Sequence, residues 1–234
     1  MSQNNGNVIV TEDLCKTYHT GEVEVHALNS VSLSIQYGEF TAIAGPSGSG
    51  KTTFLNLVSG LDKPTSGKAV LAGKQINEMS GRQLSDFRRD HIGFIFQSYN
   101  LIPVLTVKEN IEYVMLLQGV PAKDRANKVA EILELVGLEG MEKRRPTQLS
   151  GGQQQRVAIA RAMVSEPDII LADEPTANID SATGSALLDM MRKLNKERGM
   201  TFVFSTHEKM IMEKSTRLII LRDGKLHSDI KKDF

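Results

Sequence analysis

The 234-residue sequence predicts an α/β fold with three parts: a mixed, mostly parallel core sheet, an antiparallel β-subdomain and an inserted α-helical subdomain. Three observations lead to this prediction. Near its start the chain alternates between apolar and polar residues, whereas several later short runs are apolar throughout. Between residues 97 and 148 the apolar residues recur at helical spacing, and no strand-like run interrupts them.

The alternation near the start predicts the antiparallel strands. Val31, Leu33 and Ile35 would share one face, because polar residues separate them. Residues 8–10 and 70–71 are predicted to be further strands of this subdomain.

The core sheet is predicted from runs that do not alternate. Phe40–Ala44 is the first, and it leads through a glycine-rich loop into a predicted helix over Lys51–Val58, which Gly60 would end. Buried parallel strands look like this because helices cover both of their faces. The later runs cover residues 92–96, 169–172, 202–205 and 218–221, and the last one turns at Asp223-Gly224, a typical hairpin signal.

Two later helices are predicted from periodicity. Val129, Ile132, Leu133 and Val136 follow the i, i+3, i+4, i+7 spacing of a helix with one apolar face. A second stripe with the same spacing is best explained as a packed core face, and it consists of Leu187, Met190, Met191 and Leu194. We expect one domain over residues 5–230, with the helical subdomain inserted at residues 98–160.

Composition narrows the class of protein. The 28 basic residues balance 28 acidic ones and form no basic stripe, so we expect no nucleic-acid partner. The single Cys15 cannot form an internal disulfide, which fits a reducing compartment. The N-terminus is polar, unlike a signal peptide, and no apolar run approaches the roughly 20 residues that cross a bilayer. The sequence therefore predicts a cytosolic chain, whose membrane partners, if any, would do the crossing.

The glycine-rich loop has the pattern of a nucleotide-binding P-loop, G-x-x-x-x-G-K-[ST]. In such a loop successive backbone N–H groups turn toward one anion, and the following helix adds its positive end. Lys51 would reach the β- and γ-phosphates of ATP, and the Thr52 hydroxyl would bind Mg²⁺. The residues concerned are Gly45, Pro46, Ser47, Gly48, Ser49, Gly50, Lys51 and Thr52.

Besides the Thr52 hydroxyl, a P-loop protein needs a second ligand for Mg²⁺, and this one is acidic. The apolar run at residues 169–172 ends in Asp173 and Glu174, which brings both to the carboxyl edge of the sheet. Asp173 would hold Mg²⁺ through water. Glu174 would point elsewhere and accept a proton from the attacking water.

A second phosphate-binding signal lies far along the chain. It is Leu149-Ser150-Gly151-Gly152-Gln153, in which Ser150 would cap a helix beginning near Gln153. Gly151 and Gly152 would let the backbone approach a phosphate closely. Because one ATP has only one γ-phosphate, two cradles in one chain indicate that the second serves the nucleotide of another molecule.

Together these motifs resemble the nucleotide-binding domain of the ATP-binding cassette (ABC) family, over essentially the whole chain. The matching residues, in the order of that family, are 45–53, Gln97, 149–153, 169–174, Asp180 and His207. The resemblance implies that Thr53 belongs to the nucleotide site, that Gln97 senses Mg²⁺ and the attacking water, and that His207 contacts the γ-phosphate. It also implies that Asp180 lies at the shared nucleotide site and that Tyr18 stacks on adenine.

The resemblance further implies an ATPase subunit that dimerises head to tail around two ATP molecules. It implies an integral membrane permease as partner, inserting a segment near residues 98–103, and a place in the cytoplasm on the inner face of the cell membrane. The runs at residues 61–67 and 96–103 and the doubled Gln154-Gln155 are similar to the LolD/MacB group. Because the chain stops at Phe234, we expect a separate subunit rather than a domain fused to a membrane domain.

Two other functions remain open from the sequence. An ATP-bound dimer of this kind also serves as a signalling subunit of membrane complexes in cell division or cell-wall remodelling, without moving a substrate. A cassette protein acting on DNA or ribosomes would normally carry a long coiled-coil insertion or two cassettes, and neither is present here.

Overall fold

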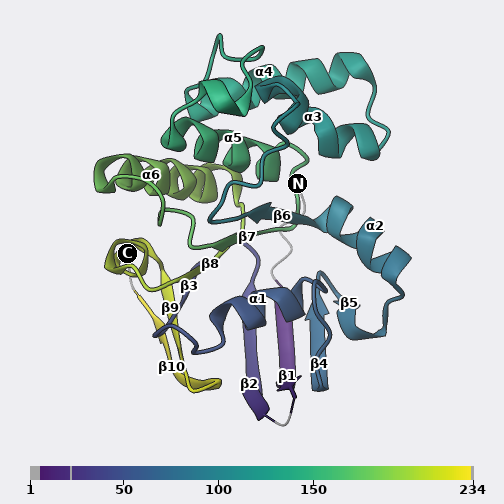
Figure 1. Cartoon of the computed structure of the whole chain (residues 1–234), viewed down its shortest axis with the longest axis vertical. Helices are drawn as coiled ribbons and strands as arrows, with labels where there is room; N and C mark the ends of the chain where they lie inside the picture. The colour runs from purple at the N-terminus through teal and green to yellow at the C-terminus, as the bar shows by residue number, and fades with distance from the viewer. Residues whose placement is uncertain (1–5, 22, 233–234) are drawn as a thin grey trace.

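The computed structural model describes residues 6–21 and 23–232, so residue 5, where the predicted domain begins, lies outside it. Within this part of the chain the strands form two sheets (Figure 1). The four-stranded sheet runs in the order β2 (Val23–Gln36), β1 (Asn7–Thr20), β4 (Ser66–Leu71) and β5 (Lys74–Gln75). The six-stranded sheet runs in the order β10 (Lys225–Lys231), β9 (Arg217–Arg222), β3 (Phe40–Ala44), β8 (Phe202–Thr206), β7 (Ile169–Asp173) and β6 (Ile92–Ile95).

The smaller sheet is antiparallel throughout, as the alternation predicts. Thr11 of β1 pairs with Leu33 of β2 on one side and with Ala69 of β4 on the other. Val31 and Ile35, on the predicted apolar face, are fully buried. Strands β1 and β2 are each 14 residues long, well beyond the short segments that the sequence predicts.

The larger sheet is mixed, also as predicted: β6, β7, β8, β3 and β9 pair in parallel, and β10 returns antiparallel to β9. Both faces of this sheet are covered. Along β3, Phe40 and Ala42 join one hydrophobic cluster whereas Ile43 joins the other. This double burial is the reason that strands β3, β6 and β7 are apolar at most positions.

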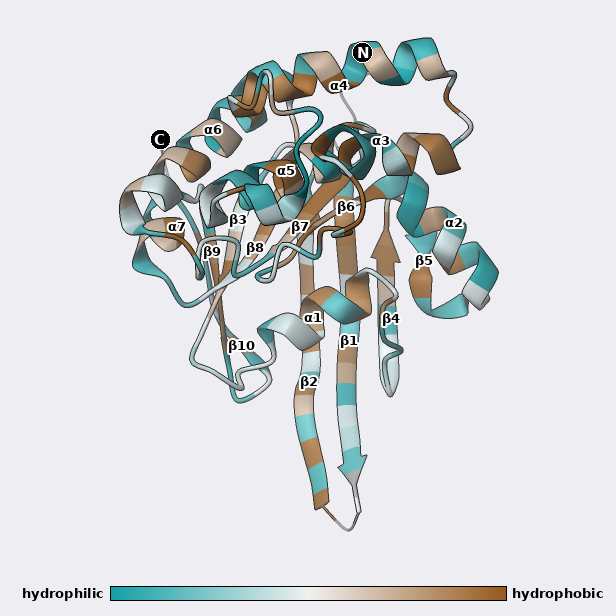
Figure 2. Ribbon diagram, turned by 45° about the horizontal axis from the view of Figure 1, so that its top comes forward, coloured by the Kyte–Doolittle hydropathy of each residue, from teal (hydrophilic) through white to brown (hydrophobic). Residues whose placement is uncertain are grey.

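The helices lie on the two sides of the core sheet (Figures 1 and 2). They are α1 (Lys51–Val58), α2 (Gly81–His91), α3 (Val107–Leu117), α4 (Ala122–Val136), α5 (Gly151–Met163), α6 (Ser181–Arg198) and α7 (Lys209–Lys214), with short 3₁₀ turns at Ile76–Glu78 and Pro146–Gln148. Helices α3, α4 and α5 follow β6 and precede β7, and they form the helical insert at the top of Figure 1. None of the helices within the described ranges is long and apolar enough to cross a membrane.

Three details differ from the expectations. Helix α5 begins at Gly151 rather than near Gln153, because Ser150 caps it two residues earlier. Strand β6 ends at Ile95, one residue before the predicted end of its run. Helix α2 carries no obvious apolar stripe, since only Leu84 and Phe87 are buried, and the sequence pattern does not reveal it.

A buried ion-pair cluster ties β9 to β10 and to Glu39, the residue before β3. The Arg217 side chain is only 8% exposed and contacts Asp229 at 2.7 Å and Glu39 at 2.9 Å. Its guanidinium lowers the pKa of the Asp229 carboxyl by hydrogen bonding, so this contribution to stability is present at neutral pH and lost as the pH falls through the lowered pKa.

We expect Arg217→Met to lower the free energy of unfolding by about 3 kcal/mol, because it removes the nearest cation from two partly buried carboxylates, of which Glu39 keeps only Lys231 at 3.8 Å. Urea denaturation measures this change. Arg222→Met is the matched control, because Arg222 is 66% exposed and lies 3.8 Å from Asp223. The control should change stability by less than about 1 kcal/mol, and equal effects of the two variants would contradict the prediction.

Candidate functional site

The glycine-rich loop connects β3 to α1 and is packed tightly on its neighbours. A Cβ atom on Gly45 would lie 2.2 Å from the Leu221 carbonyl oxygen, and one on Gly50, whose φ is +98°, would lie 2.4 Å from that of Ala27. Only glycine fits at these two positions. Gly50 gives α1 no side-chain cap, so the first N–H groups of the helix remain for another acceptor. A helix start of this kind suits the phosphates of a nucleotide.

Lys51 lies against the loop that it follows. Its side chain is largely buried, and Nζ donates to the carbonyl oxygens of Gly45 at 2.8 Å and Pro46 at 2.9 Å. The ammonium group is therefore held at the mouth of the loop, on flexible methylenes that allow it to turn toward a phosphate.

Thr52 and Asp173 meet across the sheet edge. The Thr52 hydroxyl donates to Asp173 Oδ1 at 3.1 Å and Oδ2 at 3.3 Å, although the residues are far apart in sequence. Among the residues that the structure describes, no group of three or more His, Cys, Asp or Glu residues is arranged to hold a metal. Mg²⁺ does not need one, because it is usually held by one or two protein oxygens together with water and phosphate oxygens. The pair fits Mg²⁺ in chemistry.

Glu174 stands beside this pair, at the end of β7. Its Oε1 lies 2.7 Å from His207 Nδ1, and its Oε2 accepts from the Thr206 hydroxyl at 3.3 Å. The Glu174 side chain is 14% exposed and that of His207 is 65% exposed. Glu174 also has a φ of +46°, an unusual conformation for a non-glycine residue. Backbone strain of this kind concentrates where a side chain must be aimed.

Gln97 follows β6 and its side chain is exposed. Its backbone oxygen accepts from Asn178 Nδ2 at 2.9 Å, which ties the turn after β6 to the loop before α6. No signal in the sequence points to this role of Asn178.

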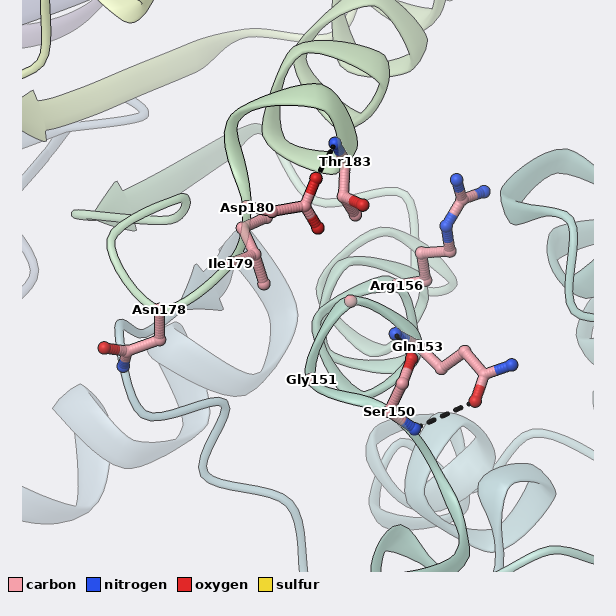
Figure 3. Close-up of a pocket in the computed structure, with 9 residues that line it drawn as sticks. Ser150, Gly151, Gln153, Arg156, Asn178, Ile179, Asp180 and Thr183 are labelled. Atoms are coloured by element: carbon pink, nitrogen blue, oxygen red, sulfur yellow. Dashed lines mark hydrogen bonds between the residues drawn. The ribbon is translucent and has the colours of Figure 1, made fainter.

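The second phosphate signal lines an open pocket of about 380 Å³ (Figure 3). Ser150, Gly151, Gly152 and Gln153 form one side, and residues from Asn178 to Thr183 form the other. Ser150 Oγ accepts from Gln153 N at 3.3 Å, while the Gln153 side chain accepts from Ser150 N at 2.9 Å, a complete capping box. Because Gly151 and Gly152 are only half-buried, a molecule outside the chain can reach them.

Asp180 caps α6 from the opposite side of this pocket. Its Oδ1 accepts from Thr183 N at 3.0 Å, and that hydrogen bond lowers the pKa of the carboxyl. The residue is therefore an anion at neutral pH with a fixed orientation, as Figure 3 shows.

Gln155 is a buried link that sequence reasoning missed. It is fully buried, and its Nε2 donates to the Pro175 carbonyl at 2.5 Å, while its Oε1 has no hydrogen-bond partner among the residues that the structure describes. This bond joins α5 to the residue that follows Glu174. Buried glutamine beside a polar helix start gives no recognisable signal in one sequence.

Tyr18 lies on β1, and its hydroxyl contacts a carboxylate of the loop after α1. It is 37% exposed, and its hydroxyl donates to Asp62 Oδ2 at 2.8 Å. Burial raises the pKa of Tyr18, and the hydrogen bond to Asp62 adds to this, whereas a hydrogen bond from the Thr53 side chain acts against it. Tyr18 therefore lies next to the start of α1, at the rim of the glycine-rich loop.

With this geometry established, comparisons with known proteins identify the family. A family model described as ABC transporter matches residues 28–177. The lipoprotein-releasing system ATP-binding protein LolD of Legionella pneumophila is 43% identical over 224 residues, covering 96% of this chain and 99% of the relative. The macrolide export ATP-binding/permease protein MacB of Brucella melitensis is 44% identical over 225 residues, covering 96% of this chain but 35% of the relative. The chain thus spans about a third of the length of that relative.

A solved structure agrees in fold. It is the dimeric, post-hydrolysis state of the ATP-binding cassette MJ0796 bound to ADP and Pi, with a TM-score of 0.89 and 42% identity. The match covers 97% of this chain and 99% of that chain. The resemblance to the LolD/MacB group is confirmed by these relatives. The chain therefore belongs to the ABC transporter family and is the ATP-binding, ATP-hydrolysing part of such a transporter.

Proposed function

We propose that two copies of this chain close head to tail around two ATP molecules, each with Mg²⁺, and that hydrolysis moves an integral membrane permease. Each nucleotide would lie between residues 45–53 of one copy and residues 150–153 of the other. The observation that carries this proposal is the open pocket at Ser150, whose lining contains no residue of the glycine-rich loop of its own chain. That pocket has two glycines and a helix start ready for a phosphate from elsewhere.

The site residues have distinct roles in this proposal. Lys51 would turn from its carbonyl partners to the β- and γ-phosphates, and Thr52 with Asp173 would hold Mg²⁺, helped by Gln97. Glu174 would take a proton from the attacking water, and His207, 2.7 Å from Glu174, would orient that carboxylate and contact the γ-phosphate. Asp180 would face the same nucleotide from the partner copy. Tyr18 would stack on adenine, for which its exposed ring beside α1 is the support.

The membrane partner would dock where the helical insert meets the core sheet. A groove of about 220 Å³ lies there, lined by Phe94, Phe96, Asn100, Val114 and Arg161. Shortly after Asn100 in the chain, Ile102 is 37% exposed and Val104 is 71% exposed. A permease segment with apolar side chains fits this groove, and it would contact the turn that carries Gln97. This arrangement would place the chain on the cytoplasmic face of the cell inner membrane.

Site-directed cross-linking tests the permease. Because Cys15 is the only cysteine, Cys15→Ser provides a cysteine-free background. We expect Val104→Cys in that background to cross-link, in the cells that make the protein, to a protein that only detergent extracts from membranes. Lys193→Cys is the control, since Lys193 is 70% exposed on α6, outside the groove. Identical adducts from both positions, or an adduct at residue 193 alone, would refute the docking site.

A further inference from the structure

Three loops with different tasks meet at Asn178. Its Nδ2 donates to the Gln97 carbonyl at 2.9 Å, and its own carbonyl accepts from the Tyr99 hydroxyl at 3.3 Å. The Tyr99 hydroxyl also lies over the start of α5, because a Cβ atom on Gly151 would be 2.9 Å from it. The turn after β6, the loop before α6 and the first turn of α5 are thereby in mutual contact.

The Asn178 side chain points toward this contact, although the residue itself also lines the pocket that Asp180 faces. In Figure 3 the Asn178 amide and the Asp180 carboxylate point in opposite directions from the same loop. Only one residue therefore separates Asn178, whose side chain is directed at the Gln97 turn, from Asp180, whose side chain lies at the surface that would meet the partner copy.

The turn itself is held in a strained conformation. Tyr99 and Asn100 have φ values of +60° and +48°, an uncommon conformation for a tyrosine and one that asparagine adopts more readily. Arg161 of α5 contacts both residues: its guanidinium donates to the Tyr99 carbonyl at 2.8 Å and to the Asn100 carbonyl at 2.5 Å. Burial lowers the pKa of Arg161, as expected for a guanidinium withdrawn from water. Since Arg161 and Asn100 also line the groove, an occupant of the groove would act directly on this turn.

We infer that Tyr99 and Asn178 form a latch that sets the position of the Gln97 turn relative to the loop carrying Asp180 and to the start of α5. This inference rests on the proposed function, because it gives the groove occupant a route to both surfaces that face the partner copy. Tyr99 and Asn178 are positioning residues: they act through Gln97, Asp180 and Gly151. The latch favours the arrangement in which all three are aligned for the closed, hydrolysing dimer.

The latch predicts a specific change in kinetics. Tyr99→Phe removes one hydroxyl, and Asn178→Ala removes the amide that holds the Gln97 carbonyl. Each should lower kcat for Mg-ATP by about 3- to 10-fold, the worth of one neutral hydrogen bond, with KM for ATP changed by less than about 2-fold. The KM for ATP should stay nearly the same because the glycine-rich loop, which would bind the phosphates, is not altered. The double variant should be about as slow as the slower single variant. The reason is that both hydrogen bonds hold the turn after β6 to the loop before α6, and the loss of either one releases that contact.

Two matched controls accompany these variants. Tyr113→Phe removes a hydroxyl from a tyrosine that is 43% exposed on α3, and Asn127→Ala removes an amide from an exposed position on α4. Both should retain the kcat of the unaltered chain. Thermal unfolding of all variants completes the measurement. Substitution of a residue that only stabilises the fold should lower the melting temperature, but it should not lower kcat at temperatures where the variant is still folded.

The outcomes separate the latch from the proposed function. Lower kcat, unchanged KM and non-additive effects support the latch. Normal kcat in Tyr99→Phe and Asn178→Ala overturns it, as does a double variant whose effects multiply, which would mean that the residues act independently. If the latch variants hydrolyse normally while Ser150→Arg abolishes the ATP-dependent dimer, the proposed function stands and only the latch is wrong.

Discussion

Glu174→Gln is expected to slow ATP hydrolysis by about 10²- to 10⁴-fold, which is the usual contribution of a general base to the rate. ATP binding should remain intact. Glutamine has nearly the same shape, and its oxygen can accept from either Thr206 or His207 while its amide nitrogen faces the other, so the fold of the site should persist. It cannot take a proton from water. Because hydrolysis would otherwise separate the two copies, we expect the variant to accumulate as an ATP-bound dimer.

Single-turnover hydrolysis and size-exclusion chromatography with ATP measure the two effects. Glu208→Gln is the control: Glu208 is a nearby carboxylate that accepts from the Thr176 hydroxyl at 2.9 Å and has no assigned part in the chemistry. It should hydrolyse ATP within about 2-fold of the unaltered chain, a change too small for loss of a general base. Normal turnover in Glu174→Gln would remove Glu174 from its role as base.

The fold was predictable where local patterns dominate. Helix α1 occupies the predicted residues because an apolar strand, three glycines and a helical stripe follow one another within one short stretch. Helix α2 was not predictable from periodicity, since it buries only two side chains and is otherwise polar or charged. Its one local signal is the capping box between Ser80 and Gln83, which marks a helix start without a length.

The site was predictable one motif at a time but not as a set of contacts. Asp173 and Glu174 follow an apolar run, so their place at the sheet edge follows from the sequence. The approach of His207 to Glu174 depends instead on β8 lying next to β7, which is a property of strand order. The contacts of Asn178 and Gln155 depend in the same way on how distant segments pack.

Ser150→Arg is expected to abolish the ATP-dependent dimer without abolishing ATP binding by a single copy. Ser150 is exposed, lies at the start of α5, and lines the pocket where a phosphate of the partner copy would approach the backbone. An arginine side chain would fill that approach and hold the two copies apart. The glycine-rich loop of the same chain is untouched, so binding of ATP to the separate copies should continue.

The substitution also destroys a helix cap, and the control must reproduce that loss. Ser80→Arg does so, because Ser80 is exposed and caps α2 through the same kind of capping box with Gln83. Each variant should lose about 0.5–2 kcal/mol of stability, but only Ser150→Arg should lose the dimer when both are placed in the Glu174→Gln background and chromatographed with ATP. A dimer that survives Ser150→Arg would mean that residues 150–153 do not face the nucleotide of the partner copy. Loss of the dimer in Ser80→Arg as well would attribute the effect to the missing cap or the added charge, because these are what the two variants share.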